Sequence, residues 1–319
     1  MERLLREKFK KNLLALMVSW FIWSPFVSMT RSYSQLFQKE LGATPLIITV
    51  ISSTFVTTFA ISKVFGGYLT DKYGRRKVLV RGTFLAAFSS LIYALAPSWE
   101  VLIIGSVIRG VSLSYQPALR SIIADSTKSE FRGRIYALVN FIPGLISALS
   151  PLIAVYLVSL YGLTYAVRLM YTASFLRGIV AIVVRYAFIK ETLEGKTRTF
   201  NLIEFYKDAL EFVHKELLGI LALKFFTLVG YALTLLKAYY VIYFLGLSEE
   251  DWGYLIFYNS LVSLPLFPSW VLHRQSWKKA STRTMFCTLL SWLHLALSSS
   301  SQVHFNILDS FDFSHLTRS

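Results

Sequence analysis

The sequence predicts an all-α membrane protein, and three observations lead to that fold class. The chain of 319 residues is 55% hydrophobic with a mean hydropathy of +0.53, too apolar for a soluble protein with an ordinary core. Several apolar runs approach the roughly 20 residues that a helix needs to cross a bilayer. The lysines and arginines, which give a formal net charge of +15, gather in loops on one side of these runs.

The apolar runs divide the chain into eight expected spans. The first six are expected at residues 12–30, 45–65, 78–96, 101–124, 135–160 and 165–189, and the last two at 216–245 and 252–268. We expect a polar loop at residues 31–44 and a cytoplasmic linker at 190–215. The domain boundaries follow: a six-span amino-terminal half at 1–189, the linker at 190–215, two further spans within 216–269, and a tail of different character at 270–319.

The basic loops set the expected orientation. Residues 1–11, 72–81, 128–134 and 185–215 are basic and lie on one side if the spans alternate, whereas the opposite loops carry few cations. The positive-inside rule then places the amino terminus in the cytoplasm of a multi-pass protein of the cell (plasma) membrane. Because the positive-inside rule accounts for the net positive charge of a protein in the lipid bilayer, no nucleic-acid partner is expected. The single cysteine, Cys287, excludes an internal disulfide framework.

One stretch, residues 66–77, is not explained by lipid: it reads Gly-Gly-Tyr-Leu-Thr-Asp-Lys-Tyr-Gly-Arg-Arg-Lys. The pattern G-x-x-x-D-x-x-G-R-[RK] resembles the loop between the second and third spans of the major facilitator superfamily, a family of secondary transporters. This resemblance implies a major facilitator-type helical bundle with a complete six-span first half and two spans of an incomplete second half. It also implies a small-molecule substrate.

The resemblance implies roles for this loop as well. In the family, the aspartate joins a charge network with an arginine of the loop between spans four and five, and this network latches the cytoplasmic side closed. The implied gate and motif loop consists of Gly67, Asp71, Gly74, Arg75, Arg76 and Arg132. The residues alone leave simpler explanations open. For Gly66 and Gly67 these are close helix packing or a cap of the second span. For the arginines the simpler explanation is that they serve only as positive-inside anchors. Asp71 is expected to complement the positive end of the third span.

Three cations inside the expected spans, Arg109, Arg177 and Lys237, are candidates for substrate binding or coupling. A charge near the membrane centre is costly, so each should face a cavity or a partner. The family has an arginine at the position of Arg109, which is tied to proton coupling in some members. The alternative is that Arg109 snorkels or pairs with a carbonyl. The spans lack the central Asp or Glu that proton-coupled transporters commonly use. Coupling to a proton would then rely on missing spans or on Asp71 or Asp125 at the rim, or it does not exist. The inner cations would equally suit an anionic substrate.

The tail after about Pro268 changes character and is predicted to be out of frame. Tryptophan has a single codon, and reading one base later converts it to glycine. In that frame Trp270 and Trp277 become glycines, and an aspartate is permitted at the position of Arg274. Two basic residues follow the second glycine. This repeats the spacing of the motif loop at the place where the family carries a second copy. We therefore hypothesise a frameshift shortly before Trp270.

These features predict transmembrane transport of a small solute by alternating access. The favoured form is secondary-active efflux of a drug-like or organic compound by an antiporter, because Pro143 to Pro151 in span five loosely resembles the signature of drug antiporters. Two alternatives stay open: uptake of an anionic small metabolite, and a non-transporting fragment that is inactive because its second half is lost. The sequence shows no metal-ligand spacing, nucleophile set or phosphate-binding loop. Neither an enzyme nor a cofactor is expected.

Overall fold

The computed structural model describes residues 2–127, 132–193 and 236–263, and helices form its regular structure. In chain order they are α1 (Glu2–Glu40), α2 (Pro45–Tyr73), α3 (Arg75–Leu95), α4 (Trp99–Ser112), the 3-10 helix η1 (Leu113–Tyr115), α5 (Gln116–Asp125), α6 (Arg132–Tyr161), α7 (Leu163–Phe188), α10 (Lys237–Tyr239), the π-helical turn η3 (Tyr240–Phe244) and α11 (Glu249–Ser263). Strands are absent from these ranges, and the all-α fold class is confirmed. Five of the described helices are long and apolar enough to cross a membrane.

The first helix is longer than its expected span. α1 runs on to Glu40, so the polar loop expected at residues 31–44 is wrong for most of its length. Tyr33, Leu36 and Phe37 explain the difference, because their spacing places all three on one helix face and each is at most 1% exposed. Burial of this face continues the helix through a stretch that hydropathy alone reads as polar.

The second helix also passes its expected end at residue 65 and includes most of the motif stretch. Gly66 lies inside α2, where a Cβ atom would stand 2.3 Å from the carbonyl oxygen of Ser114 in η1. Of the two explanations for this glycine, the structure supports close helix packing and not a cap. The chain reverses only at Gly74, whose φ of 93° favours glycine and which ends α2 and precedes α3.

The fourth expected span, 101–124, is broken into α4, η1 and α5. Pro117 stands at the second position of α5 and lacks the amide hydrogen that a continuous helix would need there. The expected spans five and six correspond to α6 and α7. Within the described residues, span seven is represented by α10 and η3 and span eight by α11; the linker from residue 194, the start of span seven and the tail lie outside them.

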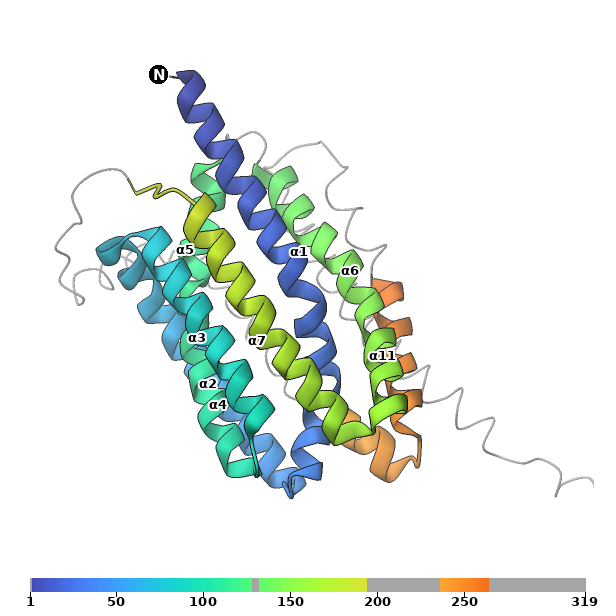
Figure 1. The fold of residues 1–319 in the computed structure, drawn as a ribbon. Helices are drawn as coiled ribbons and strands as arrows, with labels where there is room; N and C mark the ends of the chain where they lie inside the picture. The colour runs from blue at the N-terminus through green and yellow to red at the C-terminus, as the bar shows by residue number, and fades with distance from the viewer. Residues whose placement is uncertain (1, 128–131, 194–235, 264–319) are drawn as a thin grey trace, which may run out of the picture. The chain divides into compact units, whose positions relative to one another are not determined.

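Contacts between the helices build one bundle from the described residues. α7 packs against α1 and α3, α6 against α1 and α11, and α2 against α4. In Figure 1, α1 begins, α2 meets α3, and α7 ends at the same end of this bundle, which we call the basic end. Three of the basic segments predicted to share one side of the membrane thus lie together.

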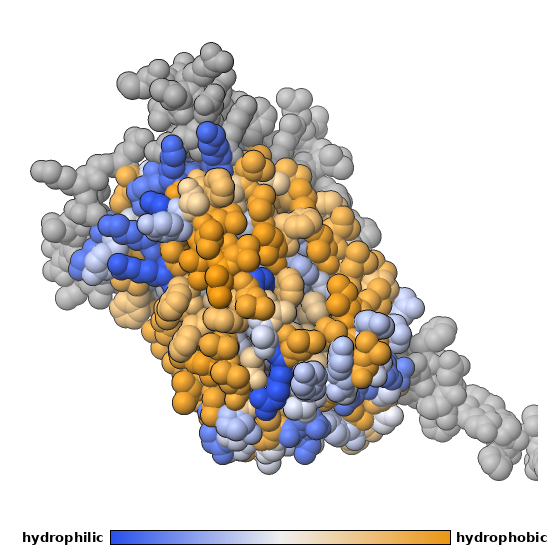
Figure 2. Space-filling model, in the orientation of Figure 1, coloured by the Kyte–Doolittle hydropathy of each residue, from blue (hydrophilic) through white to orange (hydrophobic). Residues whose placement is uncertain are grey.

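The bundle has two hydrophobic core clusters. One, at the basic end, includes Leu16, Leu79 and Ile122; the other, at the opposite end, includes Phe37 and Met170. Figure 2 shows that hydrophobic side chains also cover much of the visible outer face, while hydrophilic ones gather toward its ends. This distribution is the one a lipid-embedded bundle requires.

One proline of α6 is accommodated by a hydrogen bond from α1. Pro151 has no amide hydrogen for the carbonyl of Ser147, four residues earlier, and Ser28 Oγ of α1 donates to that carbonyl at 3.0 Å. One turn away, Ser24 Oγ donates to the carbonyl of Pro143 at 3.0 Å. Ser28 therefore supplies the donor that Pro151 lacks, and Ser24 adds a second contact between α1 and α6.

Candidate functional site

The amino terminus of α3 is capped by a carboxylate from the end of α7. The amides of Arg75 and Arg76 donate to Glu191 Oε1 and Oε2 at 3.1 and 3.0 Å. Oε1 also accepts the amides of Thr192 and Leu193, each at 3.0 Å. A carboxylate at this position satisfies helix amides that otherwise have no partner, and it complements the positive end of the helix dipole.

This geometry corrects the role expected for Asp71. Asp71 lies in the last turn of α2, and among the described residues the acceptor for the first amides of α3 is Glu191. Gly74 allows the approach of Glu191, because a Cβ at this position would stand 2.8 Å from its Oε2 atom.

The two arginines of the motif contact different elements at the basic end. Arg75 Nη1 forms an ion pair with Asp125, the last residue of α5, and donates to Thr192 Oγ1 at 3.1 Å. Arg76 donates to the carbonyl of Tyr186, and its guanidinium carbon lies 4.9 Å from the centre of the Tyr186 ring. Both arginines thus join α3 to neighbouring segments of the same half, which is more than a positive-inside anchor does.

Two other predicted gate residues have a less defined setting. Gly67 is half-buried within α2. Arg132 is the first residue of α6, but its side chain lies outside the described part, so its pairing with Asp71 stays a prediction. Glu191 and Asp125 were not among the predicted gate residues. Their signal in the sequence was weak: each is an acid at the basic end beside the last residues of an apolar run.

A second constellation lies deeper in the bundle, around Trp23 of α1. Arg177 is 4% exposed, donates to the carbonyl of Trp23 at 2.7 Å, and stacks with its guanidinium carbon 3.9 Å from a ring centre of Trp23. Arg185 is 0% exposed and donates to Ser19 of α1 at 3.3 Å and to Thr83 of α3. Arg177 is therefore enclosed within the amino-terminal half; Arg185 was not a predicted site residue.

The structure separates the remaining two inner cations. Arg109, in the last turn of α4, is half-buried, and its guanidinium has no hydrogen bond or ion pair to the residues the structure describes. Lys237 lies in α10 at the opposite end, where the next amide, of Ala238, donates to Gln35 of α1 at 3.1 Å. Lys237 therefore lies apart from Arg177, which contacts Trp23 in the middle of α1.

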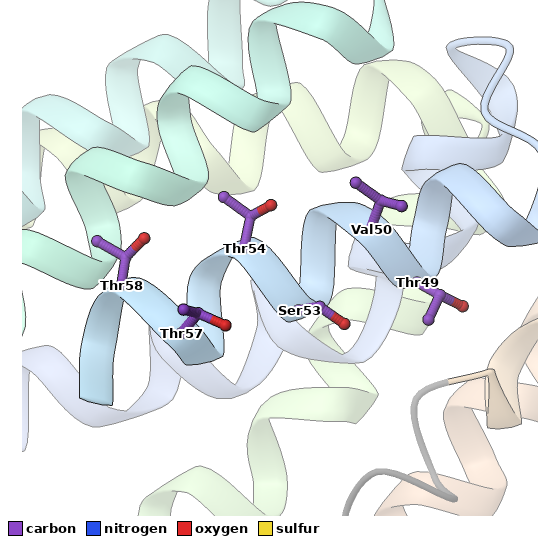
Figure 3. A pocket seen from close by; sticks show the side chains of 6 residues that line it. All are labelled: Thr49, Val50, Ser53, Thr54, Thr57 and Thr58. Atoms are coloured by element: carbon purple, nitrogen blue, oxygen red, sulfur yellow. The ribbon is translucent and has the colours of Figure 1, made fainter. Parts of the chain in front are cut away.

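A groove follows one face of α2. It has a volume of about 390 Å³ and is lined by Thr49, Val50, Ser53, Thr54, Thr57 and Thr58 (Figure 3). Five of these six side chains carry a hydroxyl group, within a helix otherwise rich in apolar residues. Gly110, the neighbour of Arg109, packs against this face, because a Cβ there would stand 2.7 Å from Cβ of Thr58.

Neither constellation has the composition of a metal centre. Among the described residues, no group of three His, Cys, Asp or Glu side chains could hold an ion. The buried arginines and the groove of α2 present guanidinium and hydroxyl groups that could bind a ligand. The basic end holds a charged helix junction. With five helices of spanning length, these features define a multi-span α-helical membrane protein.

The chain belongs to the Major Facilitator Superfamily, whose family model matches residues 12–311. Members of this family are transporters and not enzymes. The match extends past residue 270 into the stretch predicted to be out of frame, and the frame of that stretch stays a prediction.

Among curated proteins, a "Na(+), Li(+), K(+)/H(+) antiporter" of Planococcus maritimus is 26% identical over 180 residues, 54% of this chain and 40% of the antiporter. "Quinolone resistance protein NorA" of Staphylococcus aureus is 28% identical over 105 residues, 33% of this chain and 27% of that protein. Both alignments thus cover less than half of the relative.

A solved structure shares the fold. A bacterial homologue of the human lysosomal transporter Spinster, in an inward-facing and occupied conformation, superposes with a TM-score of 0.61 at 16% identity. The superposition covers 82% of this chain and 61% of that one.

Proposed function

We propose that this chain moves an organic small solute outward across the plasma membrane by alternating access, with its amino terminus and the basic end in the cytoplasm. The observation that carries the proposal is the hydroxyl-lined groove of α2. Its volume of about 390 Å³ lies within the range of roughly 300–1,000 Å³ common for small-ligand sites. Efflux is favoured by the partial likeness to a quinolone resistance protein.

Arg109 supplies the charged group of the proposed solute path. It is half-buried and lacks a protein partner among the described residues, so its donors are available to a ligand. Its neighbour Gly110 contacts the Thr58 end of the groove. A guanidinium beside hydroxyl groups would bind an acceptor-rich or anionic part of a solute.

The junction of α3, α5 and α7 is proposed as the cytoplasmic gate of this half. Arg75, Asp125 and Glu191 fix the α2–α3 turn to two other segments. A rigid turn lets the half rock as one body, which alternating access requires. The coupling ion is proposed to be a proton, as the printed name of the antiporter relative suggests, with Asp71 or Asp125 at the rim as acceptor because the described spans lack a central acid.

The test uses inside-out membrane vesicles that contain the full chain and two fluorescent dyes, cationic ethidium and anionic carboxyfluorescein. We expect one dye to accumulate when a pH gradient is imposed, and Arg109→Gln to abolish accumulation. The matched control is Arg81→Gln, an exposed arginine of α3. A second pair compares Thr57→Val in the groove with Thr172→Val on the exposed face of α7. Equal accumulation in all four variants would rule out the groove and Arg109 as the path.

Two alternatives have their own support. Uptake of an anionic metabolite is favoured by the inner arginines, and accumulation in right-side-out vesicles only would select it. A non-transporting fragment would result if the chain leaves its frame before Trp270, as the tryptophans that would read as glycines suggest. Comparing this chain with a version whose frame is restored before Trp270 distinguishes them: dye movement by the restored version alone selects the fragment.

A further inference from the structure

The two buried arginines of α7 carry more positive charge than their surroundings compensate. Arg177 and Arg185 are 4% and 0% exposed. Their neighbours are Trp23 and Ser19 of α1, Thr83 of α3 and Tyr115 of η1. All of these groups are neutral, so two guanidinium charges share one interior. Unpaired buried charges are strongly destabilising.

The described helices around the two arginines supply no carboxylate beside them. No Asp or Glu occurs between positions 12 and 39, 76 and 99, 101 and 124, or 135 and 190, which include the parts of α1, α3, η1 and α7 around the arginines. The charge of Arg109 adds to the repulsion that Arg177 experiences. The excess of positive charge around the two arginines is therefore a property of these helix segments themselves.

Each arginine also keeps a donor without a protein acceptor. Nε of Arg177 and Nη2 of Arg185 are buried and have no hydrogen-bond partner among the described residues. Both guanidinium groups lie close to the indole of Trp23, with their central carbons 3.9 and 5.7 Å from a ring centre. Two orphan donors on two cations, gathered at one aromatic side chain, form the complement of a small anion.

We propose that a small monovalent anion, a halide or a simple carboxylate, binds inside the amino-terminal half between Arg177 and Arg185, beside Trp23. The anion accepts from Arg177 Nε and Arg185 Nη2 and compensates part of their charge. The near-complete burial of both side chains excludes a bulky ion. The two arginines join α7 to α1, so an anion between them stabilises the half.

Anion-dependent stability is the direct test. The full chain is purified in a neutral detergent, and its unfolding temperature is measured as chloride or formate replaces gluconate at constant ionic strength. Gluconate is too bulky for the site. A ligand that binds only the folded state raises its stability by RT ln(1 + L/Kd), where L is the free anion concentration, so the unfolding temperature rises with the logarithm of the anion concentration above Kd. A fit of this dependence gives Kd, which is the half-saturating concentration. We expect such a rise for at least one of the two anions, and the anion that produces it distinguishes a halide site from a carboxylate site.

The variants are Arg177→Gln and Arg185→Gln, each expected to raise the half-saturating concentration at least about tenfold, because each removes a charged donor. The matched control is Arg168→Gln. Arg168 lies on the same helix and stacks on Phe37, but its donors are satisfied by the carbonyls of Ala94 and Ala96 at 2.9 and 2.6 Å. The control should keep the wild-type half-saturation.

A second measurement does not depend on the arginine variants folding. Bromide quenches tryptophan fluorescence, and a bound bromide would quench Trp23 with a saturable component that Trp23→Phe lacks. Stability that is independent of both anions would overturn the proposal. Where chloride is the stabilising anion, bromide quenching that is identical in wild type and Trp23→Phe would overturn it as well. All of these are binding measurements in detergent, so a failure of transport leaves them unaffected.

Discussion

Replacing Glu191 by alanine should destabilise the basic end of the bundle. The carboxylate accepts the first two amides of α3 at 3.1 and 3.0 Å and two amides of its own segment at 3.0 Å. Loss of a capping side chain costs about 0.5–2 kcal/mol, and loss of a negative charge at a helix amino terminus costs about 0.3–1 kcal/mol. Because water replaces part of the lost contact at a half-buried group, we expect about 2 kcal/mol for Glu191→Ala.

Thermal unfolding of the purified chain, followed by circular dichroism, measures this loss as a fall of roughly 5 °C in the midpoint. Glu191→Gln should lose about half as much, because one oxygen can still serve the three amides now bound to Oε1 while the amide of Arg76 loses its acceptor. Glu40→Gln is the control, since Glu40 is an exposed acid at the carboxyl-terminal end of α1, away from any helix amino terminus that it could cap. If Glu191→Ala unfolded within a degree of wild type, the capping role would be wrong.

Two further substitutions test the packing that positions this junction. Gly66→Ala should lower the free energy of unfolding by about 1–3 kcal/mol, because the new Cβ clashes with the carbonyl of Ser114 in η1. The control Gly144→Ala should be neutral or slightly stabilising, because a Cβ there meets nothing within 4 Å. Equal unfolding midpoints of the two variants would refute the close approach of α2 and η1. Ser28→Ala should cost about 1 kcal/mol by leaving the carbonyl of Ser147 without a donor, and the loss should shrink in the Pro151→Ala background, where a backbone amide returns; a double-mutant cycle without coupling would contradict that assignment.

Hydropathy predicted the bounds of the helices that are apolar along their whole length. The expected spans five and six correspond closely to α6 and α7 because both are apolar throughout. α1 exceeded its expected end because the face that includes Tyr33 and Phe37 is buried by tertiary contacts that an averaged hydropathy does not detect. The break at η1 was missed although Pro117 marks it, because the apolar run continues across the proline.

The candidate site was predictable in part. The motif pointed to Gly74, Arg75 and Arg76, and these residues do lie together at the helix junction. Their acidic partners were missed because Glu191 and Asp125 are 116 and 50 positions from Arg75 and become neighbours only when α5 and α7 pack against α3. The burial of Arg177 within one half was also beyond the sequence, since a cation in a span can face either a solute path or the helix interior.

Solute movement by the purified chain tests the central claim most directly. The chain is reconstituted alone into liposomes, and dye transport is followed while a pH gradient is imposed and then collapsed. The account predicts transport that stops when the gradient collapses and that is lost in Arg109→Gln but kept in Arg81→Gln. Transport that matches empty liposomes, with the folded chain present in the membrane, would contradict it.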